Sequence, residues 1–347
     1  MKSLVLWATS RCNLACRYCY AASVPPEDMK PETVRKAMDL MGDGPYKIQI
    51  TGGEPLLNPG LVEKILDLAS RRNNCRGVSI QTNGTLLCEE SVLLLKKYRV
   101  AVGISLDGKP ETNEALRGKT RQVVEGIRRL GEHRLAANLT CVVTALNAEK
   151  LGDIVDMAVY FGNIRGIGLD LLRRAGRAAT AAGSGGLKVG IAGAQQLLTG
   201  LNGLYRKVCV VNRVLPPGRQ IVIREFAKAE MQWKRETSCR DYCYAAQGRS
   251  YVVLPNGDCY PCGSLSGDEN YRMGNVHTAV RLLSVRCKVP GGCAKCRYAA
   301  VCTGGCPSRG QLCGGFDELD CVMKKFAFQI AEKQGGENET YETSETQ

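Results

Sequence analysis

Short apolar segments typical of β-strands alternate with helical segments over the first 173 residues of this chain. The predicted strands are Leu4–Ala8, Lys47–Thr51, Gly77–Gln81, Val100–Ser105, Asn138–Thr144 and Gly166–Leu171. Segments with apolar residues at helical spacing lie between them, at 31–42, 60–72, 90–97, 120–131 and 148–161. Because parallel strands need helical connections that cover the sheet, six such repeats predict an α/β fold, a partial (β/α)6 TIM-like barrel.

Three cysteines follow the first predicted strand. Cys12, Cys16 and Cys19 lie within eight residues of one another. Three thiolates at this spacing can bind three irons of a 4Fe–4S cluster. The fourth iron then has no protein ligand, and an open metal position is where substrate or cofactor binds. A structural zinc site or a set of disulfides is the alternative, but a zinc site needs a fourth ligand nearby and the next cysteine is Cys75.

Glycine-rich and polar motifs follow the next predicted strands. The second strand leads into Thr51–Pro55, the third into Gln81–Gly84 and the fourth into Ser105–Gly108, while Thr144 and Asn147 follow the fifth. The dipeptide Asp107-Gly108 is interpreted first as a turn and second as a contact. Function in β/α barrels collects at the C-terminal ends of the strands. We therefore expect the cysteine loop and these motifs to form one site.

The cysteine motif, with the aromatic Tyr18 before its last cysteine, resembles the signature of the radical S-adenosylmethionine (SAM) enzymes, and so does the Gly-Gly-Glu-Pro run that begins at Gly52. The resemblance implies that Cys12, Cys16 and Cys19 hold the cluster. It also implies that SAM binds the open iron and is reductively cleaved to a 5′-deoxyadenosyl radical, which abstracts a hydrogen atom from the substrate.

The resemblance places the methionine part of SAM against the Gly-Gly-Glu-Pro run, where glycines allow a close approach of the backbone. An arginine is expected to pair with the SAM carboxylate, either Arg117 or Arg121. The residues expected to contact the cofactor are Tyr18, Gly52, Gly53, Glu54, Pro55, Asn83, Ser105, Arg117 and Thr144.

A second group of cysteines begins at Cys239, and its spacing resembles the seven-cysteine SPASM extension of radical SAM enzymes. That extension binds two auxiliary 4Fe–4S clusters, which makes three clusters in the chain. The resemblance implies one ligand set of Cys293, Cys296, Cys302 and Cys321, and another of Cys243, Cys262 and Cys306. Cys239 is the candidate for a fourth ligand of the second set, with Cys259 and Cys313 as alternatives. A zinc ribbon remains the alternative for the Cys-x2-Cys pair.

The chain divides into four predicted parts. Residues 1–174 form the radical SAM barrel, 175–235 a bridging loop and helix, 236–333 a small cysteine-rich SPASM domain with a β-hairpin, and 334–347 a disordered acidic tail. The hairpin pairs Val252–Leu254 with Cys259–Pro261 across an Asn-Gly turn. The helix is expected at 194–208. Cys209, at its end, is interpreted either as a buried small side chain or as a catalytic hydrogen donor.

Composition places the chain in a reducing compartment. It has 347 residues and 18 cysteines, but no signal peptide and no apolar run that approaches a membrane span. The cysteines are therefore expected to be metal ligands in a cytoplasmic, anaerobic enzyme. The formal net charge is +13, yet Lys and Arg are scattered and aromatic residues are few, so no nucleic-acid partner and no membrane association are expected.

The predicted function is modification of a ribosomally made peptide, as a crosslink, a thioether or an epimerisation, with flavodoxin or ferredoxin as electron donor. The chain begins only eleven residues before Cys12, so a leader peptide is expected to be recognised by the barrel, by residues 175–193 or by a separate protein. Sulfatase-type oxidation of Ser or Cys and small-molecule cofactor biosynthesis are alternatives. The sulfatase-maturing relatives carry an acidic base directly after the cysteine matched by Cys262, where this chain has Gly263. A second alternative is a non-catalytic electron carrier.

Overall fold

One curved sheet runs through the computed structural model, which describes residues 1–180, 190–234, 242–286 and 290–342. Six strands pair in parallel, each with the next along the chain. They are β1 (Lys2–Thr9), β2 (Tyr46–Gly52), β3 (Cys75–Thr82), β4 (Ala101–Ser105), β5 (Ala137–Val143) and β6 (Ile164–Leu171). All six predicted strands are confirmed, within one or two residues at each end.

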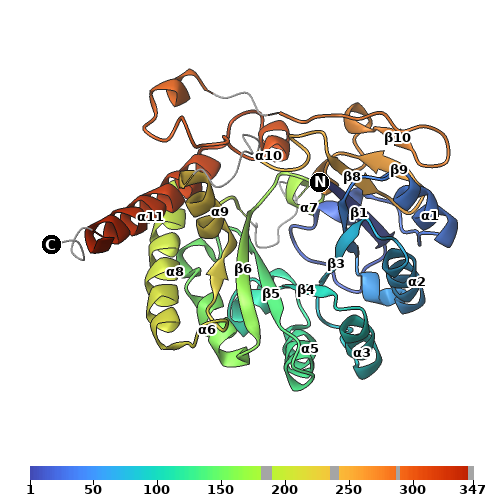
Figure 1. Ribbon diagram of the computed structural model, residues 1–347, viewed down its shortest axis with the longest axis horizontal. Coiled ribbons are helices and arrows are strands. Elements are labelled where there is room, and N and C mark those ends of the chain that lie inside the picture. Colours follow the sequence, from blue (N-terminus) through green and yellow to red (C-terminus); the bar gives the residue numbers. More distant parts are fainter. Residues whose placement is uncertain (181–189, 235–241, 287–289, 343–347) are drawn as a thin grey trace.

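Helices connect these strands and cover the outer face of the sheet (Figure 1). They are α1 (Pro31–Asp39), α2 (Pro59–Ser70), α3 (Glu89–Lys97), α4 (Pro110–Leu116), α5 (Thr120–Glu132) and α6 (Asp153–Phe161), with the 3-10 turns η1 (Tyr20–Ser23), η2 (Pro55–Leu57) and η3 (Ala148–Lys150). Helix α5 illustrates how these helices pack on the sheet, because Val123, Ile127 and Leu130 recur at helical spacing and are fully buried. The predicted helix 148–161 divides into η3 and α6. Helix α4 was not among the predicted helices.

The sheet continues beyond these six strands. The full order is β10-β9-β8-β1-β2-β3-β4-β5-β6-β7. The added strands are β7 (Val222–Ile223), β8 (Ser250–Val253), β9 (Asp258–Tyr260) and β10 (Gly274–Asn275). The predicted hairpin of β8 and β9 is confirmed as an antiparallel pair. However, β8 also pairs in parallel with β1, where Ser3 stands opposite Ser250, so the cysteine-rich module extends the barrel sheet.

The C-terminal half adds α7 (Arg177–Thr180), α8 (Ala194–Val214), α9 (Arg224–Trp233), α10 (Pro307–Leu312) and α11 (Glu318–Glu342), with η4 (Gly263–Leu265), η5 (Glu269–Tyr271) and η6 (Gly291–Lys295). Helix α11 packs against α8 and α9 (Figure 1). The rings of Phe226 and Phe326 lie 5.9 Å apart in this contact. Helix α11 is assigned as far as Glu342, over residues for which the sequence predicts a disordered tail from residue 334. In the described residues, every helix is too short or too polar to cross a bilayer.

Candidate active site

A cavity of about 900 Å³ opens at the C-terminal ends of the parallel strands. It brings together residues that lie far apart in the sequence. The expected site residues in its lining are Cys12, Cys16, Tyr18, Cys19, Gly52, Gly53, Asn83, Ser105, Arg117, Cys243 and Cys262. The N-terminal cysteine loop, part of the expected SAM site and two of the C-terminal cysteines therefore share one cavity.

The two glycines at the end of β2 let the cysteine loop pass directly over them. A Cβ atom on Gly52 would lie 2.0 Å from the carbonyl oxygen of Thr9, and one on Gly53 would lie 2.1 Å from that of Arg11. Gly52 also has a φ of +136°, which favours glycine. The Gly53 N–H donates to the Thr9 carbonyl at 2.8 Å, and this bond fixes the start of the cysteine loop on the turn.

We expect Gly53→Ala to destabilise the protein by about 1–3 kcal/mol or more, because the new methyl group meets backbone atoms that cannot move aside. Gly60→Ala is the matched control, since Gly60 lies near the start of α2 and a methyl group added there would have open space around it. Anaerobic thermal unfolding compares the two. Equal melting temperatures for the two variants would contradict the role given to Gly53.

Glu54 and Pro55 are not among the residues that line the cavity. The Glu54 carboxylate is fully buried and accepts hydrogen bonds from the Leu56 N–H at 3.1 Å, the Thr82 hydroxyl at 2.7 Å and the Asn83 N–H at 2.7 Å. Burial raises the pKa of Glu54, and these hydrogen bonds oppose the rise. Glu54 therefore ties the end of β2 to the end of β3 and acts as a positioning residue.

Asn83 holds the cysteine loop from the side of β3. Its amide nitrogen donates to the Asn13 side-chain oxygen at 2.9 Å and lies 3.8 Å from the sulfur of Cys12. Its own side-chain oxygen accepts from the N–H of Thr85 at 2.9 Å. Ser105, on the neighbouring strand, accepts a hydrogen bond from Gln81 at 3.1 Å. Both residues line the cavity, and Asn83 reaches the cysteine motif directly.

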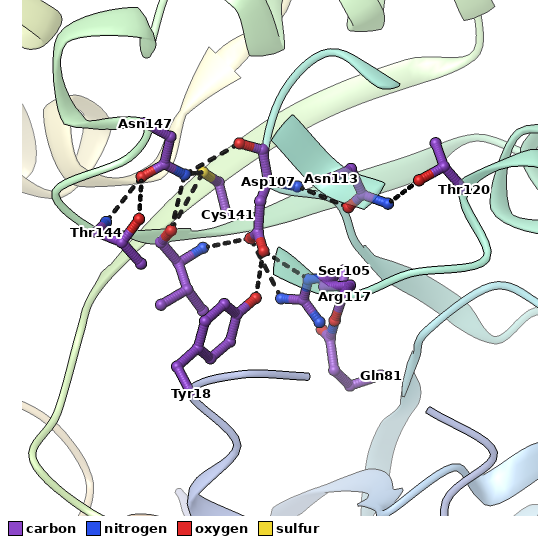
Figure 2. A network of polar contacts seen from close by, with 11 residues as sticks. Tyr18, Gln81, Ser105, Asp107, Asn113, Arg117, Thr120, Cys141, Thr144 and Asn147 are labelled. Carbon is purple, nitrogen blue, oxygen red and sulfur yellow. Dashed lines mark hydrogen bonds and ion pairs between the residues drawn. The ribbon is translucent and has the colours of Figure 1, made fainter. Parts of the chain in front are cut away.

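Asp107 is the centre of a buried polar network (Figure 2). Its carboxylate accepts from the Arg117 Nε at 2.8 Å, from the Tyr18 hydroxyl and from the Val142 N–H at 2.9 Å. The Arg117 guanidinium also lies 5.2 Å from the centre of the Tyr18 ring. The interpretation of Asp107 as a turn did not predict this network. The sequence signal that could have predicted it is a carboxylate two residues after a strand that ends at the expected site.

Three other expected contacts lie outside this cavity. Thr144 is buried, and its N–H and hydroxyl both bond the side-chain oxygen of Asn147, at 2.7 and 3.0 Å. Arg121 is exposed and pairs with Glu125 at 2.9 Å, which leaves Arg117 as the arginine at the cavity. Cys209 lies on α8, which packs against α6 and α11 on the outside of the barrel. Cys209 is not among the residues that line the cavity, and its position on α8 fits the interpretation as a packed small side chain.

The cysteines of the C-terminal module fall into two neighbourhoods. Burial raises the pKa of the Cys243 thiol, and the nearby Cys262 and Cys306 raise it further. Burial likewise raises the pKa of Cys321, and the other raising influences come from three cysteines, namely Cys293, Cys302 and Cys296. The resemblance assigns these same two groups of cysteines to the auxiliary clusters, and their role as ligands stays a prediction. Cys239 lies outside the described residues, and its rival Cys259 is fully buried in β9 within the main core.

Thiolates are the ligands that 4Fe–4S clusters take, so the donor chemistry of the three cysteine sets fits clusters. Within the described ranges, no three His, Cys, Asp or Glu side chains converge on a point suited to a single metal ion. The ligands of a cubic cluster bind separate iron corners, and they therefore do not converge on one point.

Residues 8–158 match the model of the Radical SAM superfamily. The chain carries a radical SAM domain. This confirms the predicted radical SAM domain over these residues. The serine-type anaerobic sulfatase-maturating enzyme of Klebsiella aerogenes is 29% identical over 348 residues, which cover 88% of this chain and 80% of that enzyme. An uncharacterized protein of Methanocaldococcus jannaschii is 41% identical over 183 residues, 50% of this chain and 63% of the relative.

The subtilosin biosynthesis protein AlbA of Bacillus subtilis is 34% identical over 155 residues, 42% of this chain and 34% of AlbA. The chain thus spans less than two thirds of the length of the archaeal relative and of AlbA. Among solved structures, native anSMEcpe with bound AdoMet has a TM-score of 0.78 and 22% identity, and the match covers 96% of this chain and 97% of that one. This likeness confirms the predicted partial-barrel fold of the radical SAM domain and extends over the cysteine-rich module.

Proposed function

We propose that this radical SAM enzyme modifies a ribosomally made peptide. The observation that carries the proposal is the single cavity that joins the N-terminal cysteine loop, the Gly52-Gly53 turn and the auxiliary cysteines Cys243 and Cys262. The relationship to AlbA supports a peptide substrate, because that protein serves the biosynthesis of a bacteriocin. A non-catalytic electron carrier would need no SAM pocket beside its cysteines.

In this proposal Cys12, Cys16 and Cys19 hold one 4Fe–4S cluster and the two C-terminal cysteine sets hold two more. When bound, the first cluster and SAM supply a 5′-deoxyadenosyl radical that removes a hydrogen atom from the substrate. Flavodoxin or ferredoxin supplies the electron. The anaerobic setting follows from the oxygen sensitivity of this chemistry.

The chain's own residues hold the parts of this site in place. Gly53 and Asn83 fix the cysteine loop from β2 and β3. Asp107 fixes Tyr18 and Arg117 in the cavity wall, and the Arg117 side chain is only 9% exposed. We propose that this guanidinium remains cationic beside the carboxylate of SAM and favours its binding by charge, while its position is set by Asp107.

The space available suits a chain-like substrate. A second cavity of about 1010 Å³ lies against the inner face of the sheet. The two cavities share six lining residues, namely Gln49, Gln81, Thr140, Arg224, Cys243 and Tyr244. Single small-molecule sites have volumes of about 300–1,000 Å³. Together the joined cavities offer room for SAM and for an extended peptide segment.

Sulfatase-type oxidation is the second candidate function, and the match to the Klebsiella enzyme over 88% of the chain favours it. Gly263 argues against it. This glycine lines the cavity, and a Cβ atom there would lie 3.5 Å or more from its neighbours, the nearest being the hydroxyl of Tyr20. The position of Gly263 therefore has room for an acidic side chain, so steric crowding does not explain why this chain has glycine there.

The test is an anaerobic reaction of the reconstituted protein with dithionite, SAM and the short peptides encoded beside its gene. We expect 5′-deoxyadenosine, together with a peptide that has lost two hydrogen atoms or has taken up solvent deuterium. Reactions without SAM are the control. Modification of a sulfatase-derived Ser or Cys peptide, with the neighbouring peptides unchanged, would favour the second candidate. Clusters without any 5′-deoxyadenosine would contradict both.

A further inference from the structure

Arg173 lies where the barrel meets the C-terminal cysteines. It lies two residues after the end of β6 and lines the active-site cavity. The neighbouring backbone is held firmly: the Leu172 N–H donates to the Val143 carbonyl at 3.1 Å, and the Leu172 carbonyl accepts from the buried Arg309. The direction of the Arg173 side chain is therefore set by the barrel and by the C-terminal module together.

The guanidinium of Arg173 points at the auxiliary cysteines. Its Nη2 atom lies 3.9 Å from the sulfur of Cys306 at hydrogen-bonding geometry. Its Nε atom is buried and has no hydrogen-bond partner within the described part of the chain. A buried donor without a hydrogen-bond partner destabilises the folded protein, so the position of this group is not explained by packing within the protein alone.

Arg173 carries a permanent positive charge, because an arginine side chain keeps its proton in proteins. Among the ion pairs of the described residues, Asp170 pairs with Arg224, whose nitrogen lies 3.4 Å away. Arg173 therefore brings a positive charge directly beside Cys306, one cysteine of a predicted auxiliary set.

We propose that Arg173 tunes the reduction potential of the auxiliary cluster bound by Cys243, Cys262 and Cys306. This inference rests on the proposed function, which places a 4Fe–4S cluster at these thiolates. Reduction adds one electron to the cluster and makes its net charge more negative by one. A fixed cation with an N–H···S contact stabilises the reduced form more than the oxidised form, and it therefore raises the potential.

The proposal gives this cluster a direction of electron transfer. A raised potential makes it an electron acceptor rather than a low-potential donor. The second predicted cluster, at Cys293, Cys296, Cys302 and Cys321, has no such contact with Arg173 among the interactions of the described residues. We expect its potential to be independent of Arg173, so it serves as an internal reference.

Ser308 offers a matched comparison. Its hydroxyl lies 3.3 Å from the sulfur of Cys306, where it can donate a hydrogen bond to a thiolate but brings no cation. Ser308→Ala removes one neutral hydrogen bond, Arg173→Gln removes a cation and Arg173→Lys retains the cation without the planar guanidinium. The three variants separate charge from hydrogen bonding.

The experiment is an anaerobic potentiometric titration with dithionite as electron source, followed by electron paramagnetic resonance. It uses the full chain with Cys12, Cys16 and Cys19 replaced by alanine, so that only auxiliary clusters contribute. We expect two one-electron components. In Arg173→Gln one component moves to lower potential and the other stays; Ser308→Ala moves the same component less, and Arg173→Lys retains most of the parent value.

The outcomes distinguish this inference from the function on which it rests. Iron and sulfide analysis of each variant shows whether the clusters are present at all. Absence of auxiliary clusters in the parent protein would overturn the proposed cluster assignment and this inference with it. Clusters with unchanged potentials in Arg173→Gln, or with both components shifted equally, would overturn the role of Arg173 alone.

Discussion

We expect the Cys16→Ala variant to form no 5′-deoxyadenosine above a reaction without protein. Cys16 is buried, and it lines the cavity with Cys12 and Cys19. Burial raises the pKa of its thiol, and the nearby Arg117 is the main influence that lowers it. Because two thiolates cannot hold a cube that is already open at one iron, loss of Cys16 removes the group that delivers the electron to SAM.

The matched control is Cys209→Ala. This cysteine lies on α8, outside the lining of the cavity. We expect Cys209→Ala to form 5′-deoxyadenosine and to modify the peptide at the parent rate. Iron and sulfide analysis should show about four irons fewer per chain in Cys16→Ala alone. A Cys209→Ala protein that forms 5′-deoxyadenosine but leaves the peptide unmodified would instead restore Cys209 as a hydrogen donor.

We expect Asp107→Ala to lower the free energy of unfolding by about 3–5 kcal/mol, because it leaves a buried guanidinium without its carboxylate. The Asp107 side chain is fully buried and that of Arg117 is 9% exposed. The same substitution leaves the Tyr18 hydroxyl and the Val142 N–H without their acceptor. Urea unfolding under anaerobic conditions measures the change, and SAM binding should weaken together with it.

Glu125→Ala is the control for Asp107→Ala. Glu125 also pairs with an arginine, Arg121 at 2.9 Å, but this pair is exposed on α5. We expect its removal to change the free energy of unfolding by about 0.3–0.5 kcal/mol. Adding Arg117→Met to Asp107→Ala should recover part of the lost stability, since no charge is then left buried. Similar losses for Asp107→Ala and Glu125→Ala would show that the network in Figure 2 does not stabilise the site.

Local sequence signals were sufficient for the repeating part of the fold. The strands β1 to β6 and the helices α1, α2, α3 and α5 follow from apolar spacing, because each buries one face against the same sheet. The spacing of Cys12, Cys16 and Cys19 predicted a cluster site equally directly, because ligands that lie within one short loop can be recognised without tertiary information. The strand β7 escaped prediction because two residues carry no periodicity.

The roles of individual polar residues were decided by the tertiary structure. Glu54 belongs to a motif that the resemblance assigns to SAM, yet its carboxylate meets backbone donors of β3 that are remote in sequence. From the sequence, Asp107 is interpreted first as a turn, whereas in the folded protein its carboxylate accepts hydrogen bonds from Arg117 and Tyr18.

The pairing of β8 with β1 likewise joins residues 250–253 to the N-terminus. Spacing along the chain determined which elements form and which three cysteines make the N-terminal loop, because both depend on neighbours in sequence, whereas the two C-terminal cysteine sets came from the family resemblance. The contacts of buried charges depend on which strands lie side by side, and only the folded sheet decides that.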